Sequence, residues 1–395
     1  MVSNRFSTLR SKGLSVVNAA LASFYFLSTV GCSSPTERGC TLHLVGPRPS
    51  EPISILSYDE NGHASQVDSI LPSDSVHVIQ CNENQLLILS INGSPLYFIA
   101  EKGAVTIDFK YGKVHGTPLN DTKLQFETTY NKLLSSASAK YDSIATISGI
   151  SSDDKNAELA QLSNRETRRI TDYVMTQVLN NKDNAFGQFA FLFGIAKNSL
   201  VGAEDYDKFL AKAGSYVSEF PPVHSATTLL HNTVETSAGC DIKDISVVTS
   251  DGLSSQLTSL IDTGAINVIH VFNPYNSSTP QTLYLISNIK DEVKRLERQA
   301  NNNSNVAHSN MVSHHIHINF LSVGEYVDED IVKRITQRFN LDWTMVADSN
   351  ALFIQEYGIT SLPYFIIVDG NSKIEERGVG EDALFNWVYS KIFIK

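Results

Sequence analysis

Strand and helix patterns alternate through the last part of the chain, and this alternation constrains the fold more than any other feature of the sequence. Residues 265–272 form an almost wholly apolar run, as a central parallel strand requires, because both of its faces are covered. Further patterns follow in the order helix 279–300, strand 315–321, helix 328–339, strand 364–370 and helix 383–394. We therefore expect an α/β domain over residues 237–395, with a central sheet covered by helices on both faces.

Two regions of different periodicity precede this domain. Short apolar runs separated by turn residues such as Asn92-Gly93 fill residues 40–118, which predicts a β-rich sandwich or small barrel. Apolar residues then recur at spacings of three and four over residues 119–236, which predicts a helical spacer. A chain of 395 residues is long enough for two or three such domains.

The first 31 residues have the pattern of a secretory signal. They contain three basic residues and no acidic one, and a mostly apolar stretch runs from Leu14 to Val30. The end of this stretch resembles a bacterial lipobox, which implies lipid attachment at Cys32 and a flexible tether over residues 32–39. The alternative is an uncleaved membrane anchor, although Asn18 and several serines make a poor membrane span. In either case we expect a membrane-anchored protein of the cell envelope that faces the periplasm or the cell surface.

Composition excludes some functions. The chain has 31 basic and 42 acidic residues, a net charge of −11. Such acidity disfavours the phosphate backbone, so we expect no nucleic-acid partner. Because no Walker loop, GxGxxG, GxSxG or HExxH pattern occurs, we also expect no cofactor.

The chain has only four cysteines: Cys32, Cys40, Cys81 and Cys240. No two of them form CxxC, which excludes both a zinc-knuckle pattern and a dithiol redox motif. Cys40 and Cys81 could pair within the β-rich domain in an oxidising compartment, but the sequence does not decide this. Cys240 would then be an unpaired thiol, and burial as a small apolar side chain is its simplest interpretation.

Two clusters of polar residues suggest sites, but a simpler interpretation is favoured for each. Arg165 and Arg169 could bind an anion, yet such a charge run is more often a solvated helix face. Two histidines on one strand face could ligate Zn²⁺ or Cu²⁺, but no carboxylate or cysteine joins the spacing, so we expect no metal site. These two are His315 and His317, and the same group also contains His308 and His314.

Residues 357–370, Tyr-Gly-Ile-Thr-Ser-Leu-Pro-Tyr-Phe-Ile-Ile-Val-Asp-Gly, resemble a segment of thioredoxin-fold proteins. There a helix leads through a short loop into a cis-proline and then a strand. Residues 342–348 and 240–263 are similar to other segments of the TlpA-like and peroxiredoxin-like branch. The resemblance covers about 160 residues. It implies a thioredoxin-like C-terminal domain in which Leu362 and Pro363 form the cis-proline loop, beside which an extended substrate chain pairs.

The N-terminal region also has a counterpart. Residues 101–107 and the string Gly116-Thr117-Pro118-Leu119-Asn120 look like a β-rich domain of unknown function. That domain precedes TlpA-like domains in lipoproteins of the Bacteroidetes group. The leader, the β-rich domain, the spacer and the thioredoxin-like domain are therefore mutually consistent.

The chain departs from this family where the redox cysteines belong. TlpA-like proteins place CxxC at a helix start, where the helix N-terminus lowers the pKa of the first thiol. Alignment puts the first position at Asn276 or Ser277 and the second at Thr279 or Pro280, so neither register contains sulfur. A hydroxyl forms no disulfide and is a poor nucleophile without a base. We therefore predict degenerate redox-site positions at Asn276, Ser277, Ser278 and Thr279, and no catalytic residue.

The favoured function is binding of an envelope protein or peptide at the cis-proline edge. The first alternative is a thiol-disulfide oxidoreductase or peroxiredoxin-like enzyme of the TlpA type that uses Cys240, although no resolving thiol lies near it in sequence. The second is a structural envelope protein whose working surface is the helical spacer. Because fold does not fix function, the choice among them rests on the site.

Overall fold

The computed structural model describes residues 39–149, 151–197, 201–303 and 317–392. The expected leader, the tether and Cys32 lie outside the described residues. The chain divides into an N-terminal unit that ends at Thr227 and a C-terminal unit that begins at Thr228. Among the helices that are described, none is long and apolar enough to span a bilayer.

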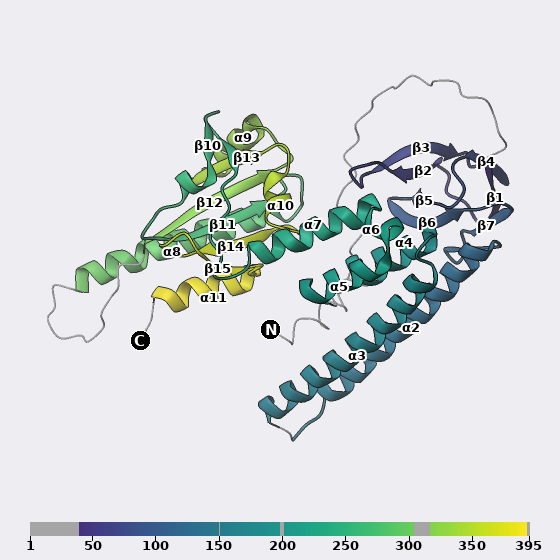
Figure 1. The fold of residues 1–395 in the computed structure, drawn as a ribbon. Helices are drawn as coiled ribbons and strands as arrows, with labels where there is room; N and C mark the ends of the chain where they lie inside the picture. Colours follow the sequence, from purple (N-terminus) through teal and green to yellow (C-terminus); the bar gives the residue numbers. More distant parts are fainter. Residues whose placement is uncertain (1–38, 150, 198–200, 304–316, 393–395) are drawn as a thin grey trace. The chain divides into compact units, whose positions relative to one another are not determined.

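The N-terminal unit begins with two packed four-stranded sheets (Figure 1). One sheet has the strand order β4-β1-β7-β8 and the other β3-β2-β5-β6. Alternate side chains of both sheets, among them Leu42, Ile55, Leu89 and Val105, form one buried core between them. The β-rich domain is therefore a sandwich. Its strands are β1 (Gly39–Val45), β2 (Ile53–Tyr58), β3 (Ala64–Ile70), β4 (Val76–Gln80), β5 (Gln85–Ile91), β6 (Ser94–Ala100), β7 (Ala104–Asp108) and β8 (Lys113–His115).

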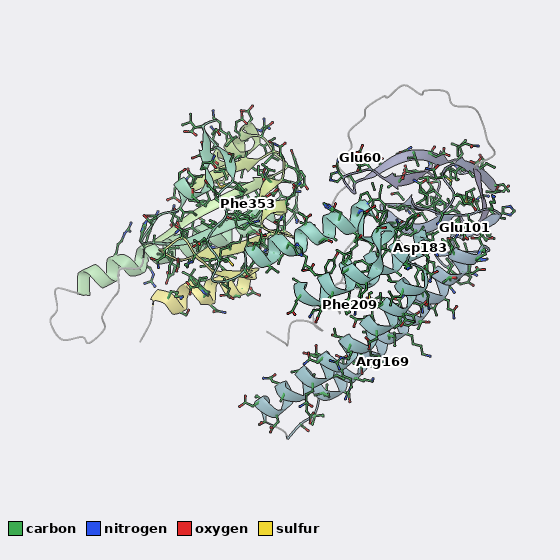
Figure 2. The ribbon with its side chains drawn as sticks, viewed as in Figure 1. Glu60, Glu101, Arg169, Asp183, Phe209 and Phe353 are labelled. Carbon is green, nitrogen blue, oxygen red and sulfur yellow. The ribbon has the colours of Figure 1, made fainter. Side chains whose placement is uncertain are left out.

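A buried polar joint connects the sandwich to the first helix. Asn120 is wholly buried; its amide accepts a hydrogen bond from the Ile99 N–H at 2.9 Å and donates one to the Ile99 carbonyl at 2.8 Å. The Glu101 carboxylate accepts from the Leu119 and Asn120 N–H groups and from the Thr117 hydroxyl. These bonds satisfy donors that every helix start leaves free. Glu101 is labelled in Figure 2. The string 116–120 and the turn at 101–103 are thus one structural joint.

Helices make up the rest of this unit. They are α2 (Pro118–Ala145), α3 (Ser152–Asn180), α4 (Ala185–Phe191), the π-helical turn η1 (Leu192–Ala196), α5 (Ala203–Ala213), α6 (Ser215–Ser218) and the first part of α7 (Pro221–Glu235), which continues into the C-terminal unit. The Arg165 and Arg169 side chains lie on a solvent-facing side of α3 beside Glu166. Glu166 is buried and also accepts a hydrogen bond from Lys140 at 2.7 Å. The two arginines therefore surround a carboxylate of their own helix.

The C-terminal unit is a seven-stranded sheet with helices on both faces (Figure 1). Its strand order is β10-β9-β13-β12-β11-β14-β15. The strands are β9 (Ser246–Thr249), β10 (Ser254–Gln256), β11 (Ile266–Phe272), β12 (Ile318–Glu325), β13 (Thr344–Asp348), β14 (Tyr364–Val368) and β15 (Ile374–Arg377). The helices are η2 (Leu257–Leu260), α8 (Thr279–Asn303), α9 (Glu329–Phe339), α10 (Leu352–Glu356) and α11 (Glu381–Ile392).

Strands β11, β12 and β13 are parallel, whereas β14 runs antiparallel to β11. The Leu362–Pro363 peptide bond before β14 is cis, as predicted. This topology defines a thioredoxin-like fold, preceded in the chain by the β-sandwich and the helices.

Several element boundaries differ from those expected. The strand expected at 315–321 is described from Ile318 and continues to Glu325, because the parallel ladder with β11 extends to the pair Phe272 and Gly324. The last turns of α7, expected in the spacer, pack within the C-terminal unit. There the Thr233 hydroxyl donates a hydrogen bond to the Gly358 carbonyl at 3.1 Å.

Candidate functional site

The site predicted from the sequence is assembled at one edge of the C-terminal sheet. Because β11, β12 and β13 are parallel, their carboxyl ends meet at the same edge. The antiparallel strand β14 begins there, since Tyr364 pairs with Val271. Continuing that register places Pro363 beside Phe272, the last residue of β11. The structure therefore brings the loop at 273–278 together with the cis-proline loop, two segments about 85 residues apart in sequence.

The loop at 273–278 is closed by its own side chains. The Asn273 side-chain oxygen accepts from the Tyr275 N–H at 2.9 Å. The Asn276 side-chain oxygen accepts from the Ser278 N–H and hydroxyl, both at 3.1 Å. The Thr279 hydroxyl donates to the Asn273 carbonyl at 2.7 Å, and the Thr279 side chain is only 6% exposed. These are Asx-type turns that lead into α8.

This arrangement leaves no redox chemistry in the loop. The side chains of Asn276, Ser277, Ser278 and Thr279 contain no sulfur, so no disulfide can form there. The Thr279 hydroxyl is held by a main-chain carbonyl, which is not a base that could activate it. The loop presents a surface instead: Tyr275 is 73% exposed, and Asn276 and Ser277 are exposed as well.

The cis-proline loop has free main-chain groups. Thr360 and Ser361 are exposed, and Leu362 and Pro363 are half-buried. Among the hydrogen bonds of the described residues, none involves the main chain of residues 360–362. Exposed main-chain donors and acceptors of this kind can pair with an extended segment of another chain.

Contacts with α7 and β15 fix the position of this loop. Gly358 has φ +57°, and a Cβ atom there would lie 2.1 Å from the Thr233 hydroxyl, so only glycine fits. The Arg377 guanidinium donates to the Tyr364 hydroxyl at 2.9 Å and to the Thr236 carbonyl at 3.0 Å, and it also bonds the Tyr357 carbonyl. The loop is therefore held on a rigid support.

Sequence reasoning missed two further exposed apolar side chains at this edge. Tyr326 follows β12 and is 56% exposed, and Leu352 follows β13 and is 38% exposed. Leu352 also lines a shallow pocket beside α10 together with Lys243, Asp244 and Ile245. With Tyr275, these residues place an apolar side chain after each of the three parallel strands. The signal in the sequence was their position one to four residues after the end of an apolar strand.

A buried carboxyl group lies at the end of β12. Glu325 is 0% exposed, neither of its carboxyl oxygens has a hydrogen-bond partner in the described structure, and it pairs in register with Asp348. Burial, together with the nearby Asp348 carboxylate, raises the pKa of Glu325 to about 9. Burial also raises the pKa of Asp348, although the main-chain N–H of Phe353 donates to it at 2.6 Å. The Glu325 side chain is therefore neutral at neutral pH.

A buried histidine lies within the sheet. The His270 ring stacks between Phe272 and Phe365, and its Nδ1 lies 3.2 Å from the Ser322 hydroxyl. The Nε2 atom is buried without a partner in the described structure, and burial lowers the pKa of His270 to about 3. His270 is therefore a neutral core residue.

Cys240 lies at the opposite edge of the sheet. Its carbonyl accepts from the Ile374 N–H at 2.8 Å, Ile374 pairs with Val368, and Val368 pairs with Asn267 near the start of β11. The five residues from Asn267 to Phe272 span about 16 Å of strand. The structure therefore does not bring Cys240 to the cis-proline loop.

Of the four clustered histidines, only His317 is among the described residues. Its ring lies 3.4 Å from the Asp262 carboxylate and is largely exposed. The described residues contain no group of three or more His, Cys, Asp or Glu side chains placed to hold a metal ion.

No family model matches the chain, and no curated protein matches it. Solved structures that resemble it include the thioredoxin domain of a thiol-disulfide oxidoreductase from Bacteroides vulgatus, at 18% identity and a TM-score of 0.29, over 40% of this chain and 99% of that one. A thiol:disulfide interchange protein from Bacteroides sp. is 16% identical, with a TM-score of 0.31, over 40% and 91%. A thioredoxin-like protein from Porphyromonas gingivalis is 18% identical, with a TM-score of 0.31, over 40% and 94%.

Proposed function

We propose that the C-terminal unit binds an extended polypeptide segment at the cis-proline edge and carries out no thiol chemistry there. The observation that carries this proposal is the free main chain of residues 360–362 beside a loop that contains no sulfur. A peptide that pairs with this main chain gains affinity from hydrogen bonds, and side-chain contacts give selectivity. The aromatic rings of Tyr275 and Tyr326 are the side chains best placed to supply those contacts.

The oxidoreductase alternative needs a thiol at the same edge. Two of the similar structures are named as a thiol-disulfide oxidoreductase and a thiol:disulfide interchange protein. In this chain the positions expected for redox cysteines are Asn276 or Ser277 and Thr279 or Pro280, and Cys240 lies at the other edge of the sheet. The geometry therefore favours binding over electron transfer at this site.

A binding measurement tests the proposal. The probe is fluorescein-labelled, carboxymethylated ribonuclease, an unfolded polypeptide whose thiols are blocked, titrated with the full chain and followed by fluorescence anisotropy. We expect Leu362→Arg to weaken binding about tenfold or more, since about 1.4 kcal/mol is one decade in Kd. Tyr275→Ser is expected to weaken it by a smaller factor.

The matched control is Leu253→Ser. Leu253 is 64% exposed, but it lies in the turn between β9 and β10, at the opposite edge of the sheet. Equal affinity for the unmodified chain and Leu362→Arg would contradict the proposal. So would reduction of insulin disulfides by the full chain that is abolished by Cys240→Ala.

We also propose that Cys32 carries a lipid that anchors the chain to an envelope membrane, facing the periplasm or the cell surface. The basic, acid-free leader and the Leu27–Cys32 pattern support this. Mass spectrometry of the mature N-terminus should find a lipid-modified Cys32. Membrane association that persists in Cys32→Ala would contradict the lipid anchor and favour a protein anchor.

A further inference from the structure

Cys40 and Cys81 are brought together by the pairing of β1 with β4. Cys40 lies directly opposite Ile79 in this antiparallel ladder, and Cys81 follows Ile79 by two residues. Side chains two residues apart on a strand point to the same face, so Cys81 is the diagonal neighbour of Cys40. Both side chains pack into the core between the two sheets, Cys40 fully and Cys81 in part. Both are free thiols in this structure.

The Cys81 thiol also acts electrostatically on Cys40. Burial raises the pKa of Cys40 to about 11, and the nearby Cys81 thiol contributes to the increase. Burial raises the pKa of Cys81 as well, and the main-chain amide of Cys40 opposes that shift. The sulfur of Cys81 therefore lies close to the backbone of Cys40.

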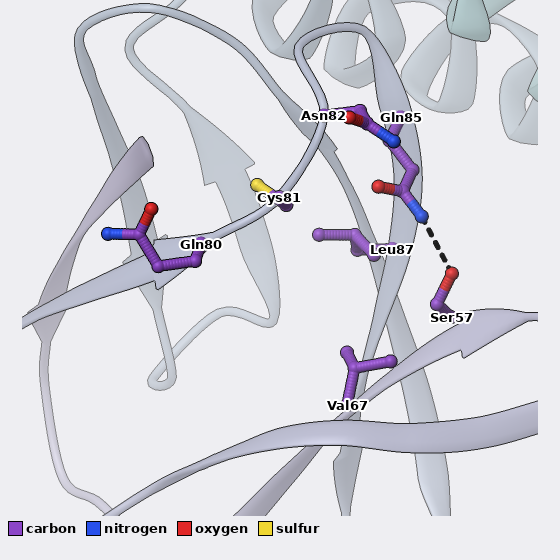
Figure 3. A pocket seen from close by; sticks show the side chains of 7 residues that line it. All are labelled: Ser57, Val67, Gln80, Cys81, Asn82, Gln85 and Leu87. Carbon is purple, nitrogen blue, oxygen red and sulfur yellow. Dashed lines mark hydrogen bonds between the residues drawn. The ribbon is translucent and has the colours of Figure 1, made fainter. Parts of the chain in front are cut away.

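Cys81 is also reachable from solvent. It lines a pocket of the β-sandwich together with Gln80, Asn82, Gln85 and Leu87 (Figure 3). Cys81 follows the last residue of β4, so the ladder does not hold its backbone. Diagonal neighbours are typically about 7–8 Å apart between Cα atoms, slightly more than a disulfide spans. A small movement of this free segment is enough to close the difference.

We propose that Cys40 and Cys81 are a redox pair that forms an intramolecular disulfide when a small-molecule disulfide enters the pocket. The Cys81 thiolate attacks the small disulfide, forms a mixed disulfide and releases one small thiol. The Cys40 thiolate then attacks the Cys81 sulfur and releases the second small thiol. The protein loses two protons and two electrons, and the small disulfide is reduced to two thiols.

The third described cysteine provides an internal reference. Cys240 belongs to the C-terminal unit, where its sulfur lies 3.6 Å from the Ser237 hydroxyl and 3.9 Å from the Val234 carbonyl. It is half-buried, as Cys81 is, but has no thiol neighbour among the described residues. Oxidation that depends on exposure alone would modify both Cys81 and Cys240. Formation of a disulfide would instead be confined to Cys81, because only Cys81 has Cys40 beside it.

Mass spectrometry after oxidation tests the proposal. The full chain is incubated with oxidised glutathione, alkylated and digested. Trypsin does not cleave the Arg48-Pro49 bond, so one peptide, 39–102, contains both cysteines. We expect this peptide to be unalkylated and lighter by about 2 Da than the reduced form, since two hydrogens are lost. Cleavage after Glu60 should leave two fragments joined until they are reduced.

Three variants separate the possible outcomes. Cys81→Ser should abolish the linked fragments, Cys240→Ser should leave them unchanged, and Cys81→Ala provides a second, apolar replacement. Circular dichroism checks that each variant is folded. The unmodified chain alone already tests whether the disulfide between Cys40 and Cys81 forms. Full alkylation of both Cys40 and Cys81 after oxidation would overturn the proposal. So would glutathione on Cys81 without closure, or a bond from either residue to Cys32 or Cys240.

Discussion

Replacing Glu325 with glutamine should stabilise the C-terminal unit at neutral and alkaline pH. Glu325 is 0% exposed, and neither oxygen has a partner in the described structure, so the folded protein holds the carboxyl group in its neutral form. In the unfolded chain the same group ionises at its ordinary pKa of 4.5, against about 9 in the folded protein. Between these values the unfolded state releases a proton that the folded state retains. Stability therefore falls as pH rises through this range.

The size of the effect follows from the separation of the two pKa values. Each pH unit above 4.5 lowers the free energy of unfolding by about 1.4 kcal/mol, until the pKa of the folded state is reached. At about pH 7.5 this amounts to about 4 kcal/mol. Glutamine has nearly the shape of the neutral acid and does not ionise. Its own unpaired amide costs roughly 1–3 kcal/mol, partly matched by the unpaired carboxyl that it replaces, so we expect a net gain of about 2–4 kcal/mol.

Tryptophan fluorescence measures this effect in the right part of the chain. The two tryptophans are Trp343 and Trp387, and both belong to the C-terminal unit. Urea unfolding of the full chain, followed by their emission at about pH 5 and about pH 8.5, gives the free energy at each pH. The control is Glu376→Gln, since Glu376 is an exposed carboxylate on β15. A Glu325→Gln chain that is no more stable than the unmodified chain at the higher pH would refute the reasoning.

His270 determines the acid side of the same profile. The pKa of His270 is about 3 in the folded protein and 6.5 ordinarily. Between these values the unfolded state binds a proton that the folded state does not bind. Stability therefore falls as pH decreases from 6.5 towards 3. Between 4.5 and 6.5 the contributions of Glu325 and His270 have opposite slopes and cancel. In Glu325→Gln the His270 slope is no longer offset by Glu325, so between pH 4.5 and 6.5 stability should rise with pH more steeply than in the unmodified chain.

Three further substitutions test the joints of the fold. Asn120→Ala leaves the buried N–H and carbonyl of Ile99 unpaired and should lower stability of the N-terminal unit by about 2–4 kcal/mol, measured by circular dichroism during unfolding. Gly358→Ala forces a Cβ against α7 at positive φ and should cost the C-terminal unit about 3 kcal/mol or more by tryptophan emission. Arg377→Lys keeps the charge but loses the forked bonds to Tyr357 and Thr236, and should cost about 2 kcal/mol. A change below about 0.5 kcal/mol would contradict the corresponding argument, since that is typical of surface positions.

Much of the fold could be predicted because its signals are local. The apolar run at 265–272 forms the central strand β11. Helix starts are recognisable from short motifs: the Asp328 side chain, for example, accepts a hydrogen bond from the Ile331 N–H. The pairing of β1 with β7 is parallel and joins strands about 60 residues apart, which no local pattern indicates. The choice of a sandwich over a barrel depended on such pairings.

The candidate site was only partly predictable for the same reason. The cis-proline loop and the loop at 273–278 are each contiguous in sequence, so their residue types could be examined directly. Tyr326 and Leu352 lie at the same edge as these loops only because the parallel strands end there. That cannot be predicted without knowing the register of the strands. Glu325 could not be singled out, because glutamate is usually exposed and its burial depends on the ladder with Asp348.

The loop at 273–278 has no thiol, and its remaining features fit the binding function proposed above. A thiolate at the start of α8 would be stabilised by the free N–H groups of the first helical turn. Here the Ser278 and Tyr275 N–H groups, which precede α8, donate to the side chains of Asn276 and Asn273, so these loop donors are already used. The loop contains no thiol that the helix start could activate. What it still offers to another molecule is the exposed Tyr275 ring, next to the unpaired main chain of residues 360–362, and that combination suits a polypeptide rather than a reaction.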